Sequence, residues 1–377
     1  MPLSLPADPP SARSLTDVVS QTIAALEGGG DWFPPARSAI VVLVDGLGRA
    51  NLTARSGHAR FLSSRLAKAD AVRAGFPSTT ATSLTSLLTG RPAGEHGIVG
   101  YRVRVPETGR AVNQLKGWES DGLDPLLWQR SSPLFELEAS RGRPCFVVSK
   151  GLYAGTGFTT AIQRGATFLA AGSVAERLAR AVEAVRVHDG ALVYVYVPEL
   201  DTVGHASGWE STRWLTALED LDRDLETFTR ALPAGTGALV TADHGMVDVP
   251  AHKHVLLREG DPLVDEVDVV AGEPRMLHLY TETGSADRVL SRWRESEHAR
   301  SWVMSRAEAI DAGLFGPRVE QAVAPRIGDV LVAARSAIAY YDDREPDKKP
   351  QRMIGQHGSL TDQERIVPLV RLGAFSR

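Results

Sequence analysis

The chain has 377 residues, of which 43% are hydrophobic and 23% charged, and this composition excludes a largely disordered protein. Its formal net charge of -4 excludes the broad basic surface that neutralises nucleic-acid phosphates, so we expect no nucleic-acid polymer as a partner. The single cysteine, Cys145, excludes an internal disulfide.

The start of the chain does not resemble an export signal. Residues Met1 to Ala12 are rich in Pro and Ser, and they lack a basic region followed by an apolar run. No segment reaches the roughly 18 consecutive apolar residues that a membrane span requires. We therefore expect a cytoplasmic protein without a membrane partner, whereas the sequence leaves its oligomeric state open.

Short apolar runs and helical patterns alternate along the chain. Residues 38–44 read as a β-branched strand of the kind buried on both faces, and the runs at 144–148, 191–197 and 238–241 are comparable. Between them, residues 174–187 and 212–232 carry apolar side chains three and four apart, as amphipathic helices do. This alternation predicts an α/β fold with a mainly parallel central sheet flanked by helices.

The pattern changes near residue 250. From there to about residue 350 the strands and helices are short, and turns are indicated at Gly272-Glu273-Pro274 and at Gly316-Pro317. We interpret residues 251–350 as an inserted cap subdomain, and residues 1–250 with 351–377 as the catalytic core.

Acidic and imidazole side chains follow the predicted strands, where a parallel sheet gathers its functional residues. They are Asp45, Asp201 with His205, Asp243 with His244, and later His357. Carboxylate oxygens and neutral imidazole nitrogens together suit zinc-class ions, and six such ligands are enough for two sites. Each has an ordinary alternative, because aspartates at strand ends often cap helices or form turns and a histidine between glycines is often a surface residue.

The segment Gly75 to Gly90 is dense in hydroxyl groups. Pro77 followed by Ser78 or Thr79 is typical of a helix start, where free amides and the helix dipole attract a phosphate. A hydroxyl in this position can act as a nucleophile if a cation lowers its pKa. The alternative is a capped helix with ordinary Ser and Thr side chains.

Taken in order, these motifs, together with His96-Gly97-Ile98, resemble the alkaline phosphatase superfamily, and in particular its nucleotide pyrophosphatase/phosphodiesterase branch. The resemblance runs from about residue 39 to residue 369. It implies an alkaline phosphatase-like core that holds two divalent metal ions, with Zn²⁺ favoured over Mn²⁺ or Mg²⁺.

The resemblance also assigns roles to individual residues. It implies that Asp45, Asp243 and His244 bind one ion, which also contacts the nucleophile, and that the other ion is bound by Asp201, His205 and His357. The nucleophile of the family precedes the glycine of a Thr-Gly pair by ten residues, and this spacing from Gly90 gives Thr80. Thr79 stays an alternative, because the Thr-Thr pair blurs the count by one.

The implied reaction is an in-line displacement, in which Thr80 attacks phosphorus and water later hydrolyses the covalent phospho-threonine. The expected substrate is a small phosphate ester or nucleotide-like molecule. Tyr101 stands where the branch has an asparagine that binds phosphate, and it could donate a hydroxyl there or stack on the leaving group. Lys150 could bind a terminal phosphate, but Leu152 replaces the second basic residue of the monoesterase pattern.

These motifs favour a phosphodiesterase or nucleotide pyrophosphatase. A phosphomonoesterase or phosphonate hydrolase needs only a different pocket around the same ions. A phosphomutase is a weaker alternative, because the context of Thr80 resembles the hydrolases better. A binding protein without turnover would lack a ligand or the nucleophile, and none is missing.

Overall fold

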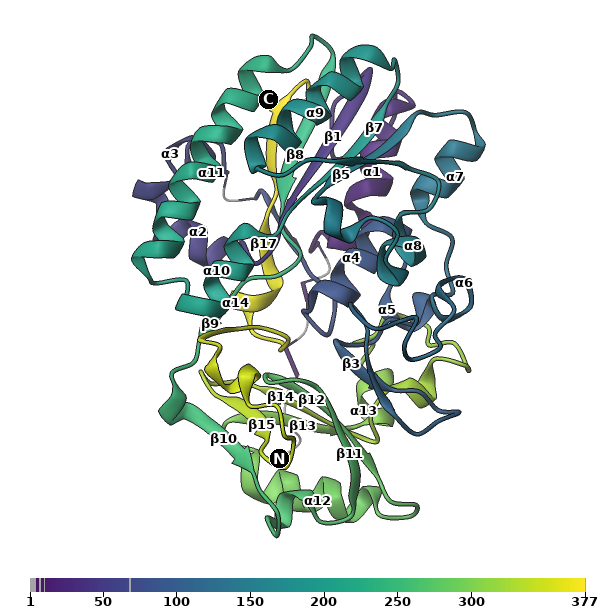
Figure 1. Cartoon of the computed structure of the whole chain (residues 1–377), viewed down its shortest axis with the longest axis vertical. Coiled ribbons are helices and arrows are strands. Elements are labelled where there is room, and N and C mark those ends of the chain that lie inside the picture. Colours follow the sequence, from purple (N-terminus) through teal and green to yellow (C-terminus); the bar gives the residue numbers. More distant parts are fainter. Residues whose placement is uncertain (1–4, 7, 10, 68, 377) are drawn as a thin grey trace.

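The fold was determined as a computed structural model, which describes residues 5–6, 8–9, 11–67 and 69–376 (Figure 1). The start of the chain, for which the sequence predicts no export signal, therefore lies partly outside the described residues. Within the described part of the chain, each helix is too short or too polar to span a bilayer.

The larger lobe is built around a six-stranded sheet with the order β18-β8-β1-β7-β5-β6. Its strands are β1 (Ser38–Val44), β5 (Cys145–Ser149), β6 (Thr167–Ala170), β7 (Leu192–Val197), β8 (Thr236–Thr241) and β18 (Val370–Gly373). All pairs are parallel except β18 with β8. Every residue of β1 is buried, because helices cover a parallel sheet on its faces. The predicted α/β fold with a mainly parallel sheet is confirmed.

Helices flank this sheet (Figure 1). Helix α9 (Val174–Val187) packs against β7 and β5, and α11 (Thr212–Ala231) packs on α9. Ser173 begins α9 with a capping box, since its hydroxyl accepts from the amide of Glu176 and the Glu176 carboxylate accepts in return. Helix α1 (Val18–Leu26) packs against β1, and α4 (Thr80–Thr89) packs on α1. The remaining helices of this lobe are α2 (Arg49–Ala54), α3 (Arg60–Ser63), α5 (Ala93–His96), α6 (Pro125–Trp128), α7 (Leu134–Ser140), α8 (Gly157–Gln163), α10 (Glu199–Ser207) and α14 (Asp362–Arg365).

A smaller lobe lies below the larger one in Figure 1. Its four-stranded antiparallel sheet has the order β11-β12-β14-β13, and it has an apolar core of its own. The elements are β10 (His254–Leu257), β11 (Val267–Glu273), β12 (Met276–Thr281), α12 (Ala286–Glu297), β13 (Ser301–Ser305), α13 (Arg306–Asp311), β14 (Val330–Ala334) and β15 (Ala339–Asp342). They fall inside the segment predicted as a cap, and the turn indicated at Gly272-Glu273-Pro274 joins β11 to β12.

The chain enters and leaves the smaller lobe through one pair of short strands. β9 (Val247–Asp248) and β16 (Gly355–Gln356) are antiparallel neighbours, so the two ends of the lobe lie side by side. Two further short pairs are β2 (Ala71–Arg73) with β17 (Ile366–Pro368), and β3 (Arg102–Arg104) with β4 (Ala111–Asn113). Segments before and after the smaller lobe therefore meet again beside the carboxyl ends of β1, β7 and β8.

Candidate active site

Asp45 follows the last residue of β1 and is almost completely buried. Its Oδ2 accepts a hydrogen bond from the Tyr196 hydroxyl of β7, whereas its Oδ1 has no hydrogen-bond partner among the described residues. Burial raises the pKa of Asp45 well above its ordinary value, and the nearby carboxylates of Asp243 and Asp201 raise it further. Such a carboxylate requires a cation to be stable in its charged form.

Asp243 and His244 follow β8 in the same way and lie beside Asp45. Asp243 Oδ1 accepts the amides of Gly46 and His244, at 3.2 and 3.0 Å, and its Oδ2 is unpartnered among the described residues. His244 Nδ1 faces the carbonyl of Gly245 at 3.1 Å. Its Nε2 lies 3.3 Å from Asp45 Oδ1 and 3.5 Å from Asp243 Oδ2. Asp45, Asp243 and His244 form the first group of candidate metal ligands.

Asp201 and His205 lie one turn apart on α10, so they share a face of the helix. His205 Nε2 is 3.3 Å from Asp201 Oδ1, and its Nδ1 lies 2.7 Å from the carbonyl oxygen of Gly355. Gly46 has a φ of 75°, and a Cβ at this position would lie 3.1 Å from Asp201 Cα. The glycine after Asp45 thus permits both the left-handed turn and the close approach of α10.

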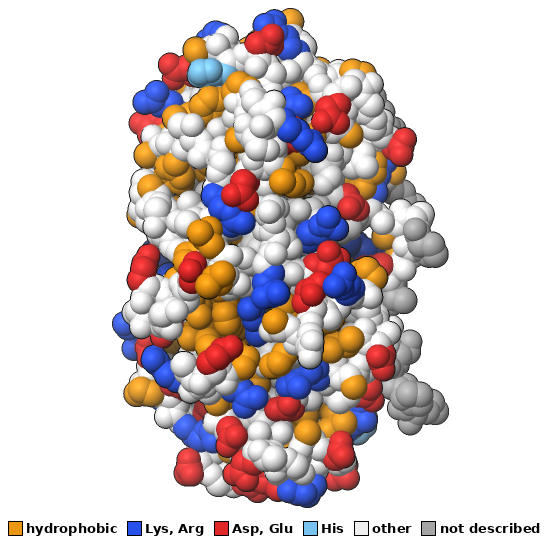
Figure 2. Space-filling model, turned by 90° about the vertical axis from the view of Figure 1, so that its right-hand side faces the viewer, with side chains coloured by type: hydrophobic (Ala, Val, Ile, Leu, Met, Phe, Trp, Pro, Cys, Tyr) orange, Lys and Arg blue, Asp and Glu red, His pale blue; other side chains and the backbone are white. Residues whose placement is uncertain are grey.

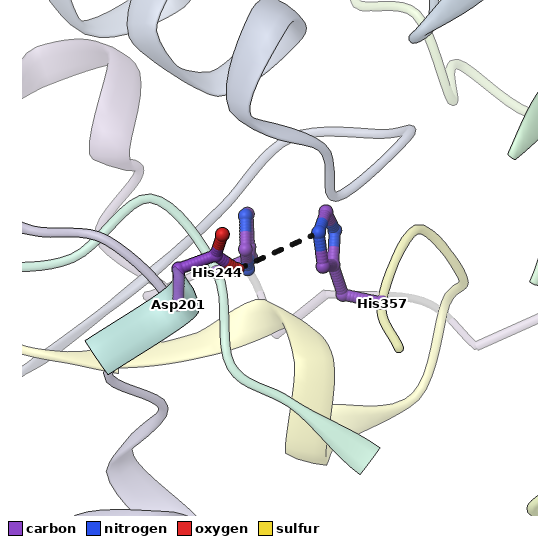
Figure 3. Close-up of side chains that lie close together, drawn as sticks. All are labelled: Asp201, His244 and His357. Carbon is purple, nitrogen blue, oxygen red and sulfur yellow. Dashed lines mark ion pairs between the residues drawn. The ribbon is translucent and has the colours of Figure 1, made fainter. Parts of the chain in front are cut away.

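His357 completes the site from the segment after the smaller lobe. Its Nδ1 faces the carbonyl of Ser78 at 3.0 Å, and its Nε2 lies 3.9 Å from Asp201 Oδ1, the pair joined in Figure 3. The ring stacks on His244 with centroids 3.5 Å apart. Burial lowers the pKa of His357 well below its ordinary value, and His244 and His205 lower it further, so the neutral imidazole is favoured. A neutral imidazole is the form that binds a metal.

The ligand atoms fall into two groups that share one histidine. Asp45, Asp243 and His244 offer atoms within 4.8 Å of one another, and so do Asp201, His244 and His357. His205 lies outside the second group, although its Nε2 contacts Asp201. The structure therefore brings all six predicted ligands together, but places His244 between the two groups.

The donor set fits divalent metal ions. Asp45, Asp201 and Asp243 each have a carboxylate oxygen that is buried without a hydrogen-bond partner in the described part of the chain. Buried carboxylates without partners are costly unless a cation binds them. The Nδ1 atoms of the three histidines each face a backbone carbonyl, which leaves Nε2 toward the carboxylates.

The predicted nucleophile also lies in this cluster. Thr80 is the first residue of α4 and is 8% exposed, and its Oγ1 lies 3.1 Å from His244 Nε2. Thr79 is the N-cap of the helix, yet its hydroxyl makes no capping bond. It interacts instead with the carboxyl of Glu273 in the smaller lobe. Of the two threonines, the hydroxyl of Thr80 is the one that faces the candidate ligands.

The two predicted substrate-binding residues, Lys150 and Tyr101, lie on the segments next to β5 and β3. Lys150 follows β5, and its Nζ pairs with Glu199 Oε1 at 2.9 Å. The buried Arg177 pairs with the same oxygen at 2.6 Å. Tyr101 is partly buried before β3, and its carbonyl accepts the amide of Gln114. Among the described residues, neither side chain forms a hydrogen bond or ion pair with the predicted ligands.

Sequence reasoning missed two residues at the candidate site: Tyr196, which contacts the candidate ligand Asp45, and Glu273, which contacts Gly358 next to His357. Tyr196 is hidden in the apolar strand β7, although Tyr194 and Tyr196 are two apart and so lie on the same face of the sheet. That paired spacing near a strand end was the available signal. Glu273 belongs to a turn of the smaller lobe, about 190 residues from the nucleophile, and no local pattern indicates its contact with Thr79.

Fold and site together define a class of α/β proteins in which a threonine at a helix start faces two groups of candidate metal ligands at the carboxyl edge of a mainly parallel sheet. The chain belongs to the type I phosphodiesterase/nucleotide pyrophosphatase family, whose model matches residues 39–360. It is therefore a phosphoester hydrolase of the alkaline phosphatase superfamily.

Solved structures of this superfamily share the fold. An inactive variant of murine ectonucleotide pyrophosphatase/phosphodiesterase 5, in complex with AMP, matches with a TM-score of 0.69 and 17% identity over 90% of this chain and 88% of that one. Its human counterpart matches with a TM-score of 0.69 and 17% identity over 90% of each chain. Phosphonoacetate hydrolase from Sinorhizobium meliloti 1021, in complex with phosphonoformate, matches with a TM-score of 0.68 and 20% identity over 91% of each chain.

Proposed function

We propose that the protein hydrolyses small phosphate esters with two bound metal ions and with Thr80 as the nucleophile, in the manner of a phosphodiesterase or nucleotide pyrophosphatase. The observation that carries this proposal is the position of the Thr80 hydroxyl, 3.1 Å from Nε2 of the histidine shared by the two ligand groups. A hydroxyl at a helix start beside a cation site has the surroundings that activate a nucleophile.

In this proposal Asp45, Asp243 and His244 hold one ion, and Asp201, His205 and His357 hold the other. Mixed carboxylate and imidazole donors favour zinc, with manganese and magnesium as alternatives. When bound, such ions lower the pKa of a nearby hydroxyl and offset the negative charge of the phosphate oxygens.

The chain itself supplies the geometry of the displacement. Thr80 begins α4, so the free amides of the first turn and the positive end of the helix dipole face an incoming phosphate. The bond from Thr80 Oγ1 to phosphorus forms as the bond to the leaving oxygen breaks, which gives a phospho-threonine. Water then cleaves the Oγ1–phosphorus bond, releases the phosphate product and restores the hydroxyl.

The substrate is proposed to be small and to be a diester. The murine relative binds AMP and the bacterial one binds phosphonoformate, so this fold accommodates small phosphorus acids. A monoester or phosphonate substrate is the second candidate, favoured by the phosphonoacetate hydrolase match. Against it, the ion pair of Lys150 with Glu199 reduces the charge available for a dianionic terminal phosphate.

One set of assays tests the proposal. Metal-loaded protein should hydrolyse bis-p-nitrophenyl phosphate and thymidine p-nitrophenyl phosphate faster than p-nitrophenyl phosphate. Thr80→Ala should lose at least about a thousandfold in kcat, because the displacement loses its nucleophile. Thr85→Ala is the matched control, since that hydroxyl of the same helix only bonds the carbonyl of Ala81. Monoester turnover above both diesters would reverse the substrate order, and full activity in Thr80→Ala would refute the covalent mechanism.

A further inference from the structure

Glu273 is a buried carboxyl of the smaller lobe that reaches the larger one. It ends β11 at the turn into β12 and is 7% exposed. Its Oε1 has no hydrogen-bond partner among the described residues. A carboxyl buried at this cost needs a reason, because a nonpolar side chain of similar size would fill the same space without the desolvation penalty.

The surroundings of Glu273 are the two segments that carry the nucleophile and His357. Its carboxyl interacts with the hydroxyl of Thr79, the residue before the nucleophile. It also packs on Gly358, where a Cβ would lie 2.6 Å from Glu273 Cγ and Cδ. Burial raises the pKa of Glu273 to about 8, and the interaction with Thr79 opposes this rise.

The two segments are already joined to each other. The amide of Ser78 donates to the carbonyl of Gly358 at 3.1 Å, and the Ser78 hydroxyl donates to the carbonyl of Ser359 at 2.7 Å. The Ser78 carbonyl faces His357 Nδ1. Glu273 therefore packs where the segment before Thr80 is hydrogen-bonded to the segment that carries His357. Because these two segments are joined, a shift of either one would displace both the nucleophile and a candidate ligand.

Thr79 lacks the hydrogen bond that a threonine at the start of a helix usually makes. An N-cap threonine ordinarily accepts a hydrogen bond from an amide of the first helical turn, whereas Thr79 makes no such bond. Because the Thr79 hydroxyl makes no capping bond, it leaves the amides of the first turn free for the phosphate. The contact also separates the roles of the two adjacent threonines, because the Thr80 hydroxyl is directed to His244.

We propose that Glu273 is a positioning residue of the smaller lobe, which holds Thr79 and thereby fixes the orientation of the Thr80 hydroxyl and of the first turn of α4. This inference rests on the proposed function of Thr80. It makes the smaller lobe part of the catalytic machinery in addition to any role in substrate recognition.

The kinetic test separates orientation from substrate binding. Glu273→Ala should lower kcat on bis-p-nitrophenyl phosphate by about tenfold to a hundredfold with little change in KM, since a misplaced nucleophile slows the chemical step. Glu273→Gln keeps an oxygen acceptor for Thr79 and should retain most of the wild-type kcat. Thr79→Val should resemble Glu273→Ala, and the double variant should lose no more than the larger single loss. Additive losses, or a loss that falls on KM alone, would overturn the proposal.

A matched control excludes a general loss of stability in the smaller lobe. Glu297 is another buried carboxyl of that lobe. It accepts hydrogen bonds from Tyr340 and Arg300. Glu297→Ala should keep the wild-type kcat at temperatures where it is folded. If it lowers kcat as much as Glu273→Ala does, Glu273 has only a structural role.

A second measurement does not depend on turnover. Hydrogen exchange of the peptide that contains residues 78–84 should be faster in Glu273→Ala than in wild type, and unchanged in Glu273→Gln and Glu297→Ala. If the wild-type protein hydrolyses none of the three esters, the proposed function fails and this measurement alone decides the role of Glu273. Unchanged exchange in Glu273→Ala overturns the positioning role in either case.

Discussion

Removal of the Tyr196 hydroxyl should weaken metal binding without disturbing the fold. In wild type, the Tyr196 hydroxyl holds Asp45 Oδ2 while Asp45 Oδ1 faces His244. Tyr196→Phe removes this hydrogen bond, so the orientation of the Asp45 carboxylate is no longer fixed. A hydrogen bond to a charged group contributes about 1.5–3 kcal/mol. Loss of a hydrogen bond that orients a metal ligand typically costs about 10- to 100-fold in affinity, equivalent to about 1.4–2.8 kcal/mol. The two ranges agree, so we expect Kd for zinc to rise by about that factor.

The measurement is a competition titration of metal-stripped protein with a chromophoric zinc chelator. Tyr194→Phe is the control, since Tyr194 lies on the same face of β7 and is fully buried, but its hydroxyl has no partner among the described residues. It should bind zinc as wild type does. An unchanged Kd in Tyr196→Phe, or an equal loss in Tyr194→Phe, would refute the argument that the Tyr196 hydrogen bond orients Asp45.

Two further predictions concern the ligands and the buried histidines. Asp243→Ala should lose at least one metal ion, as measured by elemental analysis. Asp222→Asn is the control and should keep its metal content, because the buried Asp222 carboxylate accepts the amides of residues 61 and 62. Full metal content in Asp243→Ala would contradict the assignment. His278 is buried in β12, and burial lowers its pKa from 6.5 to about 3. The folded state therefore holds it neutral, so its contribution to stability is complete above about pH 6.5 and is lost as the pH falls from there toward 3. Urea unfolding of metal-free protein should show a smaller loss of stability on acidification in His278→Gln than in wild type, and equal losses would rule this out.

The sequence predicts the core of the fold because buried parallel strands are locally visible. The run at residues 38–44 coincides with β1. The helix predicted at 174–187 coincides with α9, and the one predicted at 212–232 covers all of α11, which ends one residue earlier at Ala231. The limits of the predicted cap at residues 251 and 350 stay a prediction. Short strands of the smaller lobe carry weaker patterns, since their register depends on contacts between distant segments.

Some residues of the candidate site could likewise be predicted from the sequence, and others could not. Asp45 and the Asp243-His244 pair are predictable because they follow buried strands directly, and order along the chain links them to the other ligands. The choice between Thr79 and Thr80 requires the direction of each hydroxyl, which spacing does not supply. Tyr101 and Lys150 rest on the resemblance, and their roles stay predictions. Glu273 acts through a contact across two lobes, which only the folded chain shows.

Because β9 and β16 are paired, the smaller lobe is an insertion whose two ends lie next to each other. Because Val247 lies opposite Gln356, a short turn would suffice to close the core without the intervening segment. Such an arrangement lets a core with fixed ligands accept different lobes, as domain insertion does where chain ends are close. A transplanted lobe would then have to provide its own contact to Thr79, and a chimaera that folds and binds metal but turns over slowly would identify that contact as the missing part.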